Sequence, residues 1–312
     1  MKIAITGGTG FVGNLLSREM IAKGHEVFIF TRRKPAKTLN ANYVEINYQN
    51  KEALKENLKG IEAIVHLAAA LFARSRNEFF ISNALSTKNL IEASNENNLK
   101  KFVYISSLAA GGPCPSNENI RTEEMIDNPV SYYGKSKLAA ENEVKKFKSK
   151  YIILRPPIVY GPKDSGFSTI ARYVKKGIMV SPSSNKSKFS FIYLNDLVKA
   201  IEKAVFEEIE NDKYYVCENN IYEWQEFISK MAENLKVKMP KMINLPKPLM
   251  YMAGFSYEIL SYLTSTLPVL NRDKVREAKA GDWICSSKKW ESKTSQKWTP
   301  LSDGLRETFE KI

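Results

Sequence analysis

The stretch TGGTGFVG, residues 6–13, joins an apolar strand pattern to a helical pattern and carries glycines at three-residue intervals. Gly7 would allow a tight turn, Gly10 would let the backbone approach a pyrophosphate, and Gly13 would let a helix pack closely on a strand. The N-terminus of the following helix would offer free N–H groups and a positive dipole end to an anion. A glycine motif in this strand–helix context predicts a dinucleotide-binding site.

Strand and helix patterns alternate outward from this stretch over the first two-thirds of the chain. Such alternation is typical of a parallel sheet covered by helices on both faces. The sequence therefore predicts an α/β fold, a Rossmann-type doubly wound parallel sheet with a smaller, mostly helical C-terminal substrate lobe. The expected strands are 2–6, 26–31, 43–47, 63–68, 101–106 and 151–156, and the expected helices are 11–22, 78–97 and 131–148.

The pattern loosens in the last part of the chain. Pro156, Pro157 and Pro162 indicate a sharp exit from the sheet, and residues 181–187 are typical of an exposed loop. Residues 217–312 show helical patterns and no sheet alternation.

One further strand is expected at 188–194, leading into a helix for which Asn195 or Asp196 is a suitable N-cap. This strand and helix would return to the sheet. We therefore expect a dinucleotide-binding domain of residues 1–156, joined again by 188–216, and a substrate-binding lobe of residues 157–187 and 217–312.

The charge of the chain is strongly basic, with 47 Lys and Arg against 34 Asp and Glu and a net charge of +13. The lysines are dispersed and no nucleic-acid motif accompanies them, so we expect a solvated surface with general affinity for anions and no nucleic-acid partner. No apolar run reaches the roughly 18–20 residues that span a bilayer.

The three cysteines, Cys114, Cys217 and Cys285, are far apart in the sequence and odd in number. They show neither metal-ligand spacing nor a disulfide framework, so we expect no metal site and a reducing, cytoplasmic location. The N-terminus runs straight into a strand pattern rather than a signal peptide.

The second expected strand ends in FTRRK, with Arg32 and Arg33 where an NAD-selective site usually places an acidic residue. Guanidinium groups suit a ribose 2′-phosphate and recognise a bare hydroxyl less well. The sequence therefore favours NADP, with NAD as the alternative cofactor.

The stretch SYYGKSK, residues 131–137, contains two tyrosines ahead of two lysines. If it is helical, Tyr133 and Lys137 are neighbours on one face, whereas Tyr132 points elsewhere. A tyrosine has an unperturbed pKa of about 10, too high for a base at neutral pH. We expect the ammonium of Lys137 and a positive nicotinamide ring to lower the pKa of Tyr133.

Seven motifs in order resemble those of the extended short-chain dehydrogenase/reductase family, within the NAD-dependent epimerase/dehydratase superfamily. The resemblance covers nearly the whole chain and implies a Ser–Tyr–Lys catalytic set and a nicotinamide cofactor. The motifs are TGGTGFVG (6–13), HLAA (66–69), Asn83, VYISSLAAGGP (103–113), YGKSK (133–137), LRPPIVYGP (154–162) and FIYLNDL (191–197).

The resemblance assigns Tyr133 as the reacting group and Lys137 as its partner, which would also hold the ribose hydroxyls. The catalytic serine is Ser107, with Ser106 left open because the motif is shorter here. His66 is expected to be a core histidine rather than a catalyst. The implied cofactor-binding residues are Gly7, Thr9, Gly10, Phe11, Val12, Gly13, Arg32, Arg33, Asn47 (where the family often has an Asp), Ala68, Ala69, Asn83, Tyr133, Lys137 and Pro156.

The C-terminal segments resemble the 3β-hydroxysteroid dehydrogenase branch, notably 245–270 and 297–309. We therefore expect an NAD(P)-dependent oxidoreductase acting on a secondary alcohol or ketone, lipid-like or steroid-like. A nucleotide-sugar epimerase or dehydratase is the first alternative. Those enzymes usually carry an arginine where this chain has Phe189, although Lys186 and Lys188 are nearby. A non-catalytic NADP-binding regulatory protein is the second alternative.

Two partners besides the small-molecule substrate are expected. The apolar C-terminal segment and the basic surface together suit transient docking on an anionic bilayer. Family members often dimerise through the helices that would be 78–97 and 131–148 here, so a homodimer is expected.

Overall fold

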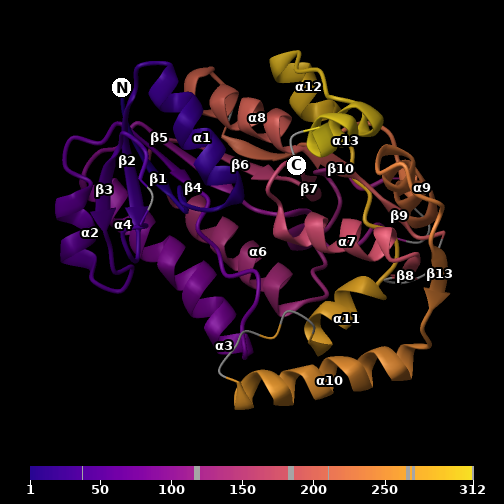
Figure 1. The fold of residues 1–312 in the computed structure, drawn as a ribbon. Coiled ribbons are helices and arrows are strands. Elements are labelled where there is room, and N and C mark those ends of the chain that lie inside the picture. The colour runs from indigo at the N-terminus through magenta and orange to yellow at the C-terminus, as the bar shows by residue number, and fades with distance from the viewer. Residues whose placement is uncertain are drawn as a thin grey trace.

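A seven-stranded parallel sheet forms the centre of the protein, which confirms the predicted α/β, Rossmann-type fold (Figure 1). The computed structural model describes residues 1–36, 38–115, 120–181, 186–209, 211–264, 268 and 271–310. The strand order is β11-β6-β5-β4-β1-β2-β3. The bounds are β1 Lys2–Thr6, β2 Glu26–Thr31, β3 Asn42–Glu45, β4 Ala63–His66, β5 Lys101–Ile105, β6 Lys150–Arg155 and β11 Asp212–Tyr215.

Helices cover both faces because successive side chains of a strand point to opposite sides. Ile3 and Ile5 of β1 pack in one cluster with Leu16 of α1 and Leu197 of α8. Ala4 between them packs in the cluster of the other face. The helices on the first face are α1 Phe11–Ala22 and α8 Leu194–Phe206, and those on the second are α2 Lys51–Asn57, α4 Ser86–Glu96 and α6 Tyr132–Val144.

The expected helix at 78–97 is three segments, α3 Arg76–Phe79, a π-helix η1 at Phe80–Leu85, and α4. Side-chain hydroxyls bond to carbonyls at the end of the π-helical turn, from Ser86 to Ile81 at 3.0 Å and from Thr87 to Asn83 at 2.6 Å. Such bonds compete with regular backbone pairing. Single π-helical turns are frequent at functional sites.

The expected strand at 188–194 is two short strands, and neither joins the central sheet. β10 (Phe191–Tyr193) pairs with β7 (Ile158–Tyr160), and β9 (Lys188–Phe189) pairs with β12 (Tyr222–Glu223). The outer position beside β6 is taken by β11. The prediction that 188–194 joins the central sheet is therefore wrong, and β11 was not predicted.

The helix after β10 begins earlier than expected. α8 starts at Leu194, so Asn195 and Asp196 lie inside its first turn and neither is the N-cap. The buried carboxylate of Asp196 instead accepts the backbone N–H of Thr299 at 2.5 Å. This bond fastens the C-terminal segment to the start of α8.

The C-terminal part is mostly helical, around an aromatic core that includes Phe167, Phe191 and Phe227. The expectation that 217–312 contains no strands is wrong, because β12 lies there and β13 (Lys241–Asn244) pairs with β8 (Ile178–Ser181). The expected loop at 181–187 falls mostly outside the described residues. The division into two domains stays a prediction. The remaining helices are α5 Leu108–Gly111, α7 Ser165–Lys175, α9 Trp224–Asn234, α10 Lys247–Leu263, α11 Arg272–Ala278, α12 Lys288–Thr294 and α13 Leu301–Glu310.

α10 lies at the margin of the molecule, where it packs against α11 (Figure 1). Among the described residues, no helix has the length and apolar character to cross a bilayer.

The sulfur atoms of Cys217 and Cys285 lie 3.7 Å apart in the core as free thiols, although they are distant in sequence. The helices α4 and α6 pack side by side. Homodimerisation through them and a cytoplasmic location stay predictions.

Candidate active site

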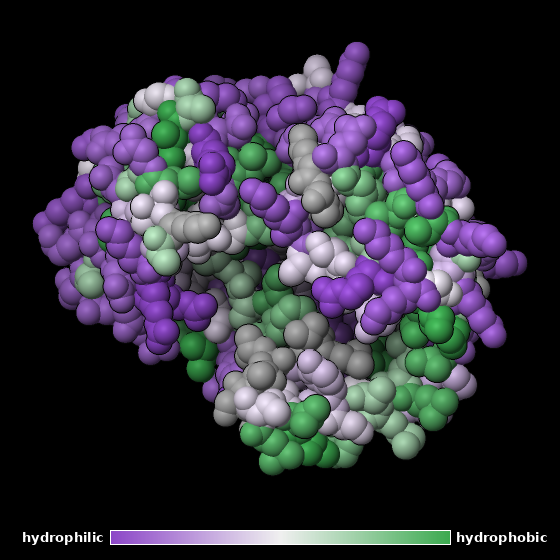
Figure 2. All heavy atoms as spheres, viewed as in Figure 1, coloured by the Kyte–Doolittle hydropathy of each residue, from purple (hydrophilic) through white to green (hydrophobic). Residues whose placement is uncertain are grey.

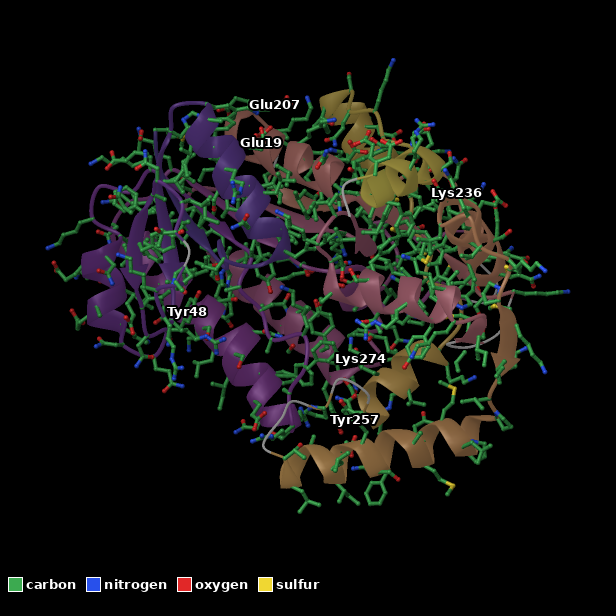
Figure 3. The ribbon with its side chains drawn as sticks, in the orientation of Figure 1. Glu19, Tyr48, Glu207, Lys236, Tyr257 and Lys274 are labelled. Atoms are coloured by element: carbon green, nitrogen blue, oxygen red, sulfur yellow. The ribbon has the colours of Figure 1, made fainter. Side chains whose placement is uncertain are left out.

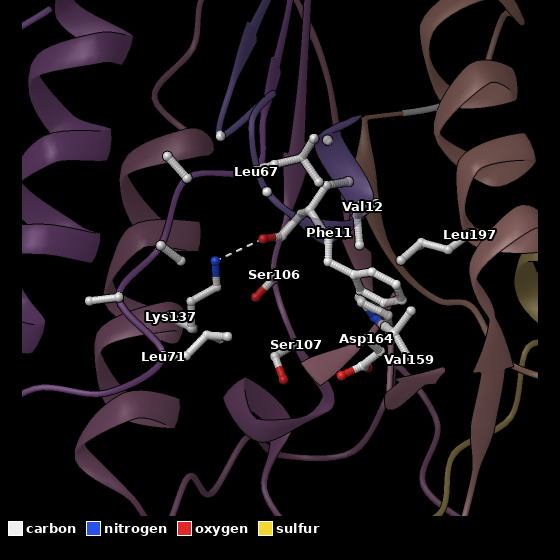
Figure 4. A pocket seen from close by; sticks show the side chains of 18 of the residues that line it. Phe11, Val12, Leu67, Leu71, Ser106, Ser107, Lys137, Val159, Asp164 and Leu197 are labelled. Atoms are coloured by element: carbon white, nitrogen blue, oxygen red, sulfur yellow. Dashed lines mark hydrogen bonds between the residues drawn. The ribbon is translucent and has the colours of Figure 1, made fainter. Parts of the chain in front are cut away.

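One cavity lies at the carboxyl ends of β1, β2, β4, β5 and β6, where parallel sheets of this kind bind ligands. Figure 2 shows the surface hollowed near the centre of this face, and Figure 4 shows side chains that line the cavity. Residues of the C-terminal lobe close its other side. The lining includes all the expected site residues except Asn47 and Asn83.

The glycine cradle, Gly7, Gly10 and Gly13, lies at the turn between β1 and α1. A side chain on Gly7 would meet the backbone of Ala68 at 2.9 Å, and one on Gly13 would meet the carbonyl oxygen of Gly7 at 2.2 Å. Gly7 also has a φ of +70°, which favours glycine. The N-cap of α1 is Gly10, which offers no side-chain cap to the first-turn N–H groups. Those groups are therefore open to an anion.

Arg32 and Arg33 follow β2 at the cavity, as predicted. Arg32 is close enough to Tyr48 to lower the pKa of its phenol, although burial is the larger effect and raises that pKa to about 12. Asn47 does not line the cavity; its side chain accepts the N–H of Gln49 at 2.9 Å. The neighbours Tyr48 and Gln49 line it instead, and a role for Asn47 in cofactor binding stays a prediction.

Asn83 supports the cavity from behind rather than lining it. Its amide accepts the N–H of Ala70 at 2.7 Å, donates to the carbonyl of Ala70 at 3.2 Å and donates to Ser136 at 2.9 Å. These bonds tie the segment that carries Ala68 and Ala69 to α6. Asn83 is therefore placed to position the lining rather than to touch a ligand.

His66 is a core histidine, as expected. Its ring nitrogens are hydrogen bonded to the hydroxyls of Thr6 at 2.6 Å and Thr87 at 2.9 Å. Burial is the main cause that lowers its pKa to about 3, so the ring is neutral at physiological pH.

Tyr133 and Lys137 both face the cavity from one side of α6, which Ser131 caps by accepting the N–H of Gly134 at 2.9 Å. Ser107 lines the same cavity, close to the phenol of Tyr133. Tyr132 does not line the cavity, and the guanidinium of Arg276 lies 5.4 Å from its ring centroid. The pairing of Tyr133 with Lys137 follows the predicted helical spacing.

Ser106 and Ser107 differ in their partners. Ser107 caps α5 by accepting the N–H of Ala109 at 3.1 Å, which leaves its hydroxyl beside Tyr133. Ser106 donates to the buried carboxylate of Glu141 at 2.5 Å. The same carboxylate accepts two bonds from the buried guanidinium of Arg155. Ser106 lines the cavity too (Figure 4), but its hydroxyl is held in this network with Glu141 and Arg155.

Lys137 is buried with its ammonium turned toward β5. It donates to the carbonyl of Ile105 at 2.7 Å (Figure 4) and lies 4.2 Å from the ring centroid of Tyr104. Burial lowers the pKa of Lys137 to about 7, and the charge of Glu141 opposes this change.

The chain's own groups raise the pKa of Tyr133, which differs from the expected lowering. Burial is the largest cause, the charge of Glu277 adds to it, and the hydrogen bond from Ser107 opposes it. Burial penalises the phenolate more than the neutral phenol. The protein by itself therefore keeps Tyr133 protonated at neutral pH.

Sequence reasoning missed the contribution of the C-terminal lobe to this site. Lys274 and Glu277 of α11 line the cavity, and the ammonium of Lys274 lies 4.8 Å from the ring centroid of Tyr133. Phe189 and Trp283 add apolar surface. No local motif marks these residues, because their place depends on how α11 packs against α6.

The model of the NAD dependent epimerase/dehydratase family matches residues 3–217 of the chain. The chain belongs to this family. The protein is an NAD-dependent oxidoreductase of the NAD dependent epimerase/dehydratase family.

Similar members of the epimerase/dehydratase family act on different substrates. A ceramide reductase of Caulobacter vibrioides is 28% identical over 98% of this chain and 90% of its own. A decarboxylating sterol-4-alpha-carboxylate 3-dehydrogenase of Dictyostelium discoideum is 23% identical over 80% of this chain and 81% of its own. The solved structure of MoeE5 with UDP-glucuronic acid and NAD has a TM-score of 0.79 at 21% identity, covering 99% of this chain and 98% of that one. This last likeness supports the fold.

The cavity residues fit the NAD cofactor of the family. The glycine cradle leaves room that any side chain would fill, and the uncapped start of α1 offers N–H groups for a pyrophosphate. The guanidinium groups of Arg18, Arg32 and Arg33 add positive charge along the same wall.

Proposed function

We propose that this protein is an NADP-preferring reductase that converts a lipid-like ketone to the secondary alcohol. The observation that carries the proposal is that Ser107, Tyr133 and Lys137 line the same cavity as the glycine cradle. The proton donor Tyr133 and the hydrogen-bond donor Ser107 then lie in the cavity that would hold the dinucleotide. The apolar residues Leu71, Phe189 and Trp283 suit a lipid-like substrate.

In the proposed direction, reduction, Tyr133 begins the reaction as the neutral phenol. A reduced nicotinamide, held by the glycine cradle when bound, would supply the hydride for the carbonyl carbon. Tyr133 gives its phenolic proton to the carbonyl oxygen, so the products are the alcohol, the oxidised cofactor and a phenolate that regains a proton from water. The Ser107 hydroxyl donates a hydrogen bond to the same oxygen. Lys137 stabilises the phenolate and holds the ribose hydroxyls.

Two observations support a lipid-like ketone over a nucleotide sugar. The ceramide reductase matches the chain over nearly its full length. Phe189 lines the cavity where nucleotide-sugar enzymes of the family usually place an arginine. The nucleotide-sugar alternative is favoured by a UDP-glucose 4-epimerase of Vibrio cholerae, 30% identical over 65% of this chain and 66% of its own, and by the fold-level likeness to MoeE5.

Arg32 and Arg33 carry the preference for NADP in this proposal. Changing both to serine is expected to weaken NADPH binding at least about 100-fold, since two charged contacts are lost and hydrogen bonds to a charged phosphate are each worth about 1.5–3 kcal/mol. NADH binding is expected to stay within about threefold of the unchanged protein. Fluorescence titration of both cofactors measures this, and Arg306→Ser, an exposed charge on α13, is the control.

The unchanged protein is also used to test the substrate class. We expect it to oxidise NADPH when the lipid-like ketone dodecan-3-one is added as the probe. Stoichiometric NAD released from the denatured protein, together with epimerisation of UDP-glucose, would replace the reductase by the nucleotide-sugar alternative. Equal loss of NADPH and NADH affinity in the double variant would refute the role of the two arginines.

We propose in addition that the exposed face of α10 rests on an anionic bilayer. The face consists of apolar side chains at helical spacing that point away from the body, and Figure 2 shows them at the lower edge of the molecule. Met250, Gly254 and Ser261 face inward. Lys238 and Lys241, which precede α10 in the sequence, and Arg272, which pairs with Glu258 of α10, are exposed and suit acidic headgroups. The apolar face comprises Leu249, Met252, Phe255, Ile259, Leu260 and Leu263.

Flotation with phosphatidylglycerol vesicles tests this surface. The unchanged protein is expected to float with them and not with phosphatidylcholine vesicles. Changing Met252 and Leu263 (63% and 79% exposed) to glutamate is expected to reduce flotation at least about tenfold, because each charge opposes insertion. Ile126→Glu, at an 89% exposed site outside α10, is the matched control. Absence of flotation would contradict membrane docking. Dimers that form without lipid and are lost in the double variant would instead assign this face to a contact between two copies of the chain.

A further inference from the structure

Helix α11 of the C-terminal lobe is fastened to the start of α6, the helix that carries Tyr133. The carboxylate of Asp273 is buried and accepts the N–H of Tyr132 at 2.9 Å and that of Tyr133 at 3.4 Å. These are first-turn N–H groups that lack partners inside the helix. A negative charge at this end also suits the helix dipole. The position of α11 is therefore set relative to the reacting phenol.

Glu277 lies one turn further along α11 and is held from several directions. Its carboxylate accepts the hydroxyl of Ser131 at 3.1 Å and the ammonium of Lys274 at 2.6 Å. The indole N–H of Trp283 donates to its backbone carbonyl at 3.0 Å. The carboxylate has a fixed place at the wall of the cavity.

Lys274 reaches across the cavity wall toward Tyr133. Its ammonium lies 4.8 Å from the ring centroid of Tyr133 and 5.8 Å from that of Phe72. Figure 3 shows Lys274 on α11, between α10 and the body of the molecule. Its side chain is 27% exposed, and the exposed part faces the cavity that it lines.

The pair formed by Lys274 and Glu277, called the α11 pair here, has no part in the proton transfer described above. The pair is partly buried, with the side chains of Lys274 and Glu277 27% and 16% exposed. Glu277 moreover raises the pKa of Tyr133, after burial, and so disfavours the phenolate. The ammonium has three donors and the carboxylate about four acceptor sites. The bonds named above use one of those donors and two of those acceptor sites, so capacity for a ligand stays open beside the reacting phenol.

We propose that the α11 pair recognises a second polar group on the substrate, a hydroxyl or amide one to two carbons from the reacting carbonyl. Lys274 would donate to its oxygen and Glu277 would accept its O–H or N–H. This inference deepens the proposed reductase function and rests on it. The substrate class becomes a lipid-like ketone with a neighbouring hydroxyl or amide, rather than a plain ketone or sterol. A site built to hydrogen-bond a hydroxyl discriminates strongly against the analogue that lacks it.

Equilibrium binding of two alcohols to the NADPH complex tests the inference. Neither alcohol can react there, since cofactor and ligand are both reduced. The probes are dodecane-1,3-diol and dodecan-3-ol, and the change in NADPH fluorescence reports binding. The unchanged protein is expected to bind the diol about tenfold more tightly, as one to two hydrogen bonds would give. In Lys274→Met and Glu277→Gln the ratio is expected to fall below about twofold.

Arg272→Met is the matched control, because it removes a positive charge from the same helix while its side chain contacts Glu258 of α10. It is expected to keep the tenfold ratio, and NADPH affinity is expected to stay unchanged in all three variants. Equal binding of both alcohols by the unchanged protein, or an unaltered ratio in both α11-pair variants, overturns the inference alone. Failure of both alcohols to bind overturns the reductase proposal as well.

Discussion

Replacing Tyr133 with phenylalanine is expected to lower kcat about 1,000-fold while NADPH binds with nearly unchanged Kd. A positioned general acid contributes about 10²- to 10⁴-fold to a rate. Phenylalanine keeps the buried ring, including its packing beside Phe79, and removes only the hydroxyl that would give up the proton. The loss should therefore appear in kcat rather than in folding or cofactor binding.

Tyr132→Phe supplies a matched control for this prediction. It makes the same chemical change one residue earlier, on a side chain that packs under Arg276 outside the cavity. We expect its kcat to stay within about twofold of the unchanged enzyme. Equal activity of the Tyr133 variant and the unchanged enzyme would remove Tyr133 from the mechanism. Equal losses in both variants would point to a structural cause.

The parts of the site that lie within a single strand–helix turn could be predicted from the sequence. The glycine cradle could be predicted from residue spacing. Only glycine fits at position 13, because a Cβ added there would lie 2.2 Å from the carbonyl oxygen of Gly7. The relation of Tyr133 to Lys137 follows from helical periodicity alone. Both are local in the chain and need no knowledge of packing.

The contributions from distant segments could not be predicted in this way. β11 joins the sheet beside β6, although local alternation marks 188–194 equally well as a strand. Lys274 and Glu277 reach Tyr133 only because Asp273 caps α6, a contact between segments far apart in the sequence. The choice between Ser106 and Ser107 likewise needs the positions of Glu141 and Tyr133.

The side-chain directions of residues that follow a strand end, and the pKa values of buried groups, were also difficult to predict from the sequence. Asn47 was expected beside the cofactor, whereas its neighbours Tyr48 and Gln49 line the cavity. These residues follow the end of β3 at Glu45, so their side-chain directions do not obey the two-residue alternation of a strand. The raised pKa of Tyr133 has a comparable origin, because the depth of its burial is a property of the whole packed site.

Changing Gly13 to alanine is expected to weaken NADPH binding about 100-fold. The added Cβ would lie 2.2 Å from the carbonyl oxygen of Gly7 and 2.7 Å from the Cα of Gly8, so backbone rather than a flexible side chain must move. A shift of α1 away from β1 displaces the first-turn N–H groups from the pyrophosphate. Overpacking costs about 1–3 kcal/mol, and the upper end corresponds to this loss of affinity.

Gly24→Ala separates loss of the cradle from a general loss of stability. Gly24 has a φ of +79° and open space around its Cα, so alanine there strains the backbone and leaves the cradle intact. It is expected to cost about 1–2 kcal/mol of unfolding free energy with an unchanged Kd for NADPH. Chemical denaturation and fluorescence titration of both variants measure the two quantities. Tight NADPH binding by the Gly13 variant would contradict the cradle, because the close approach of α1 to β1 would then be dispensable for holding the cofactor.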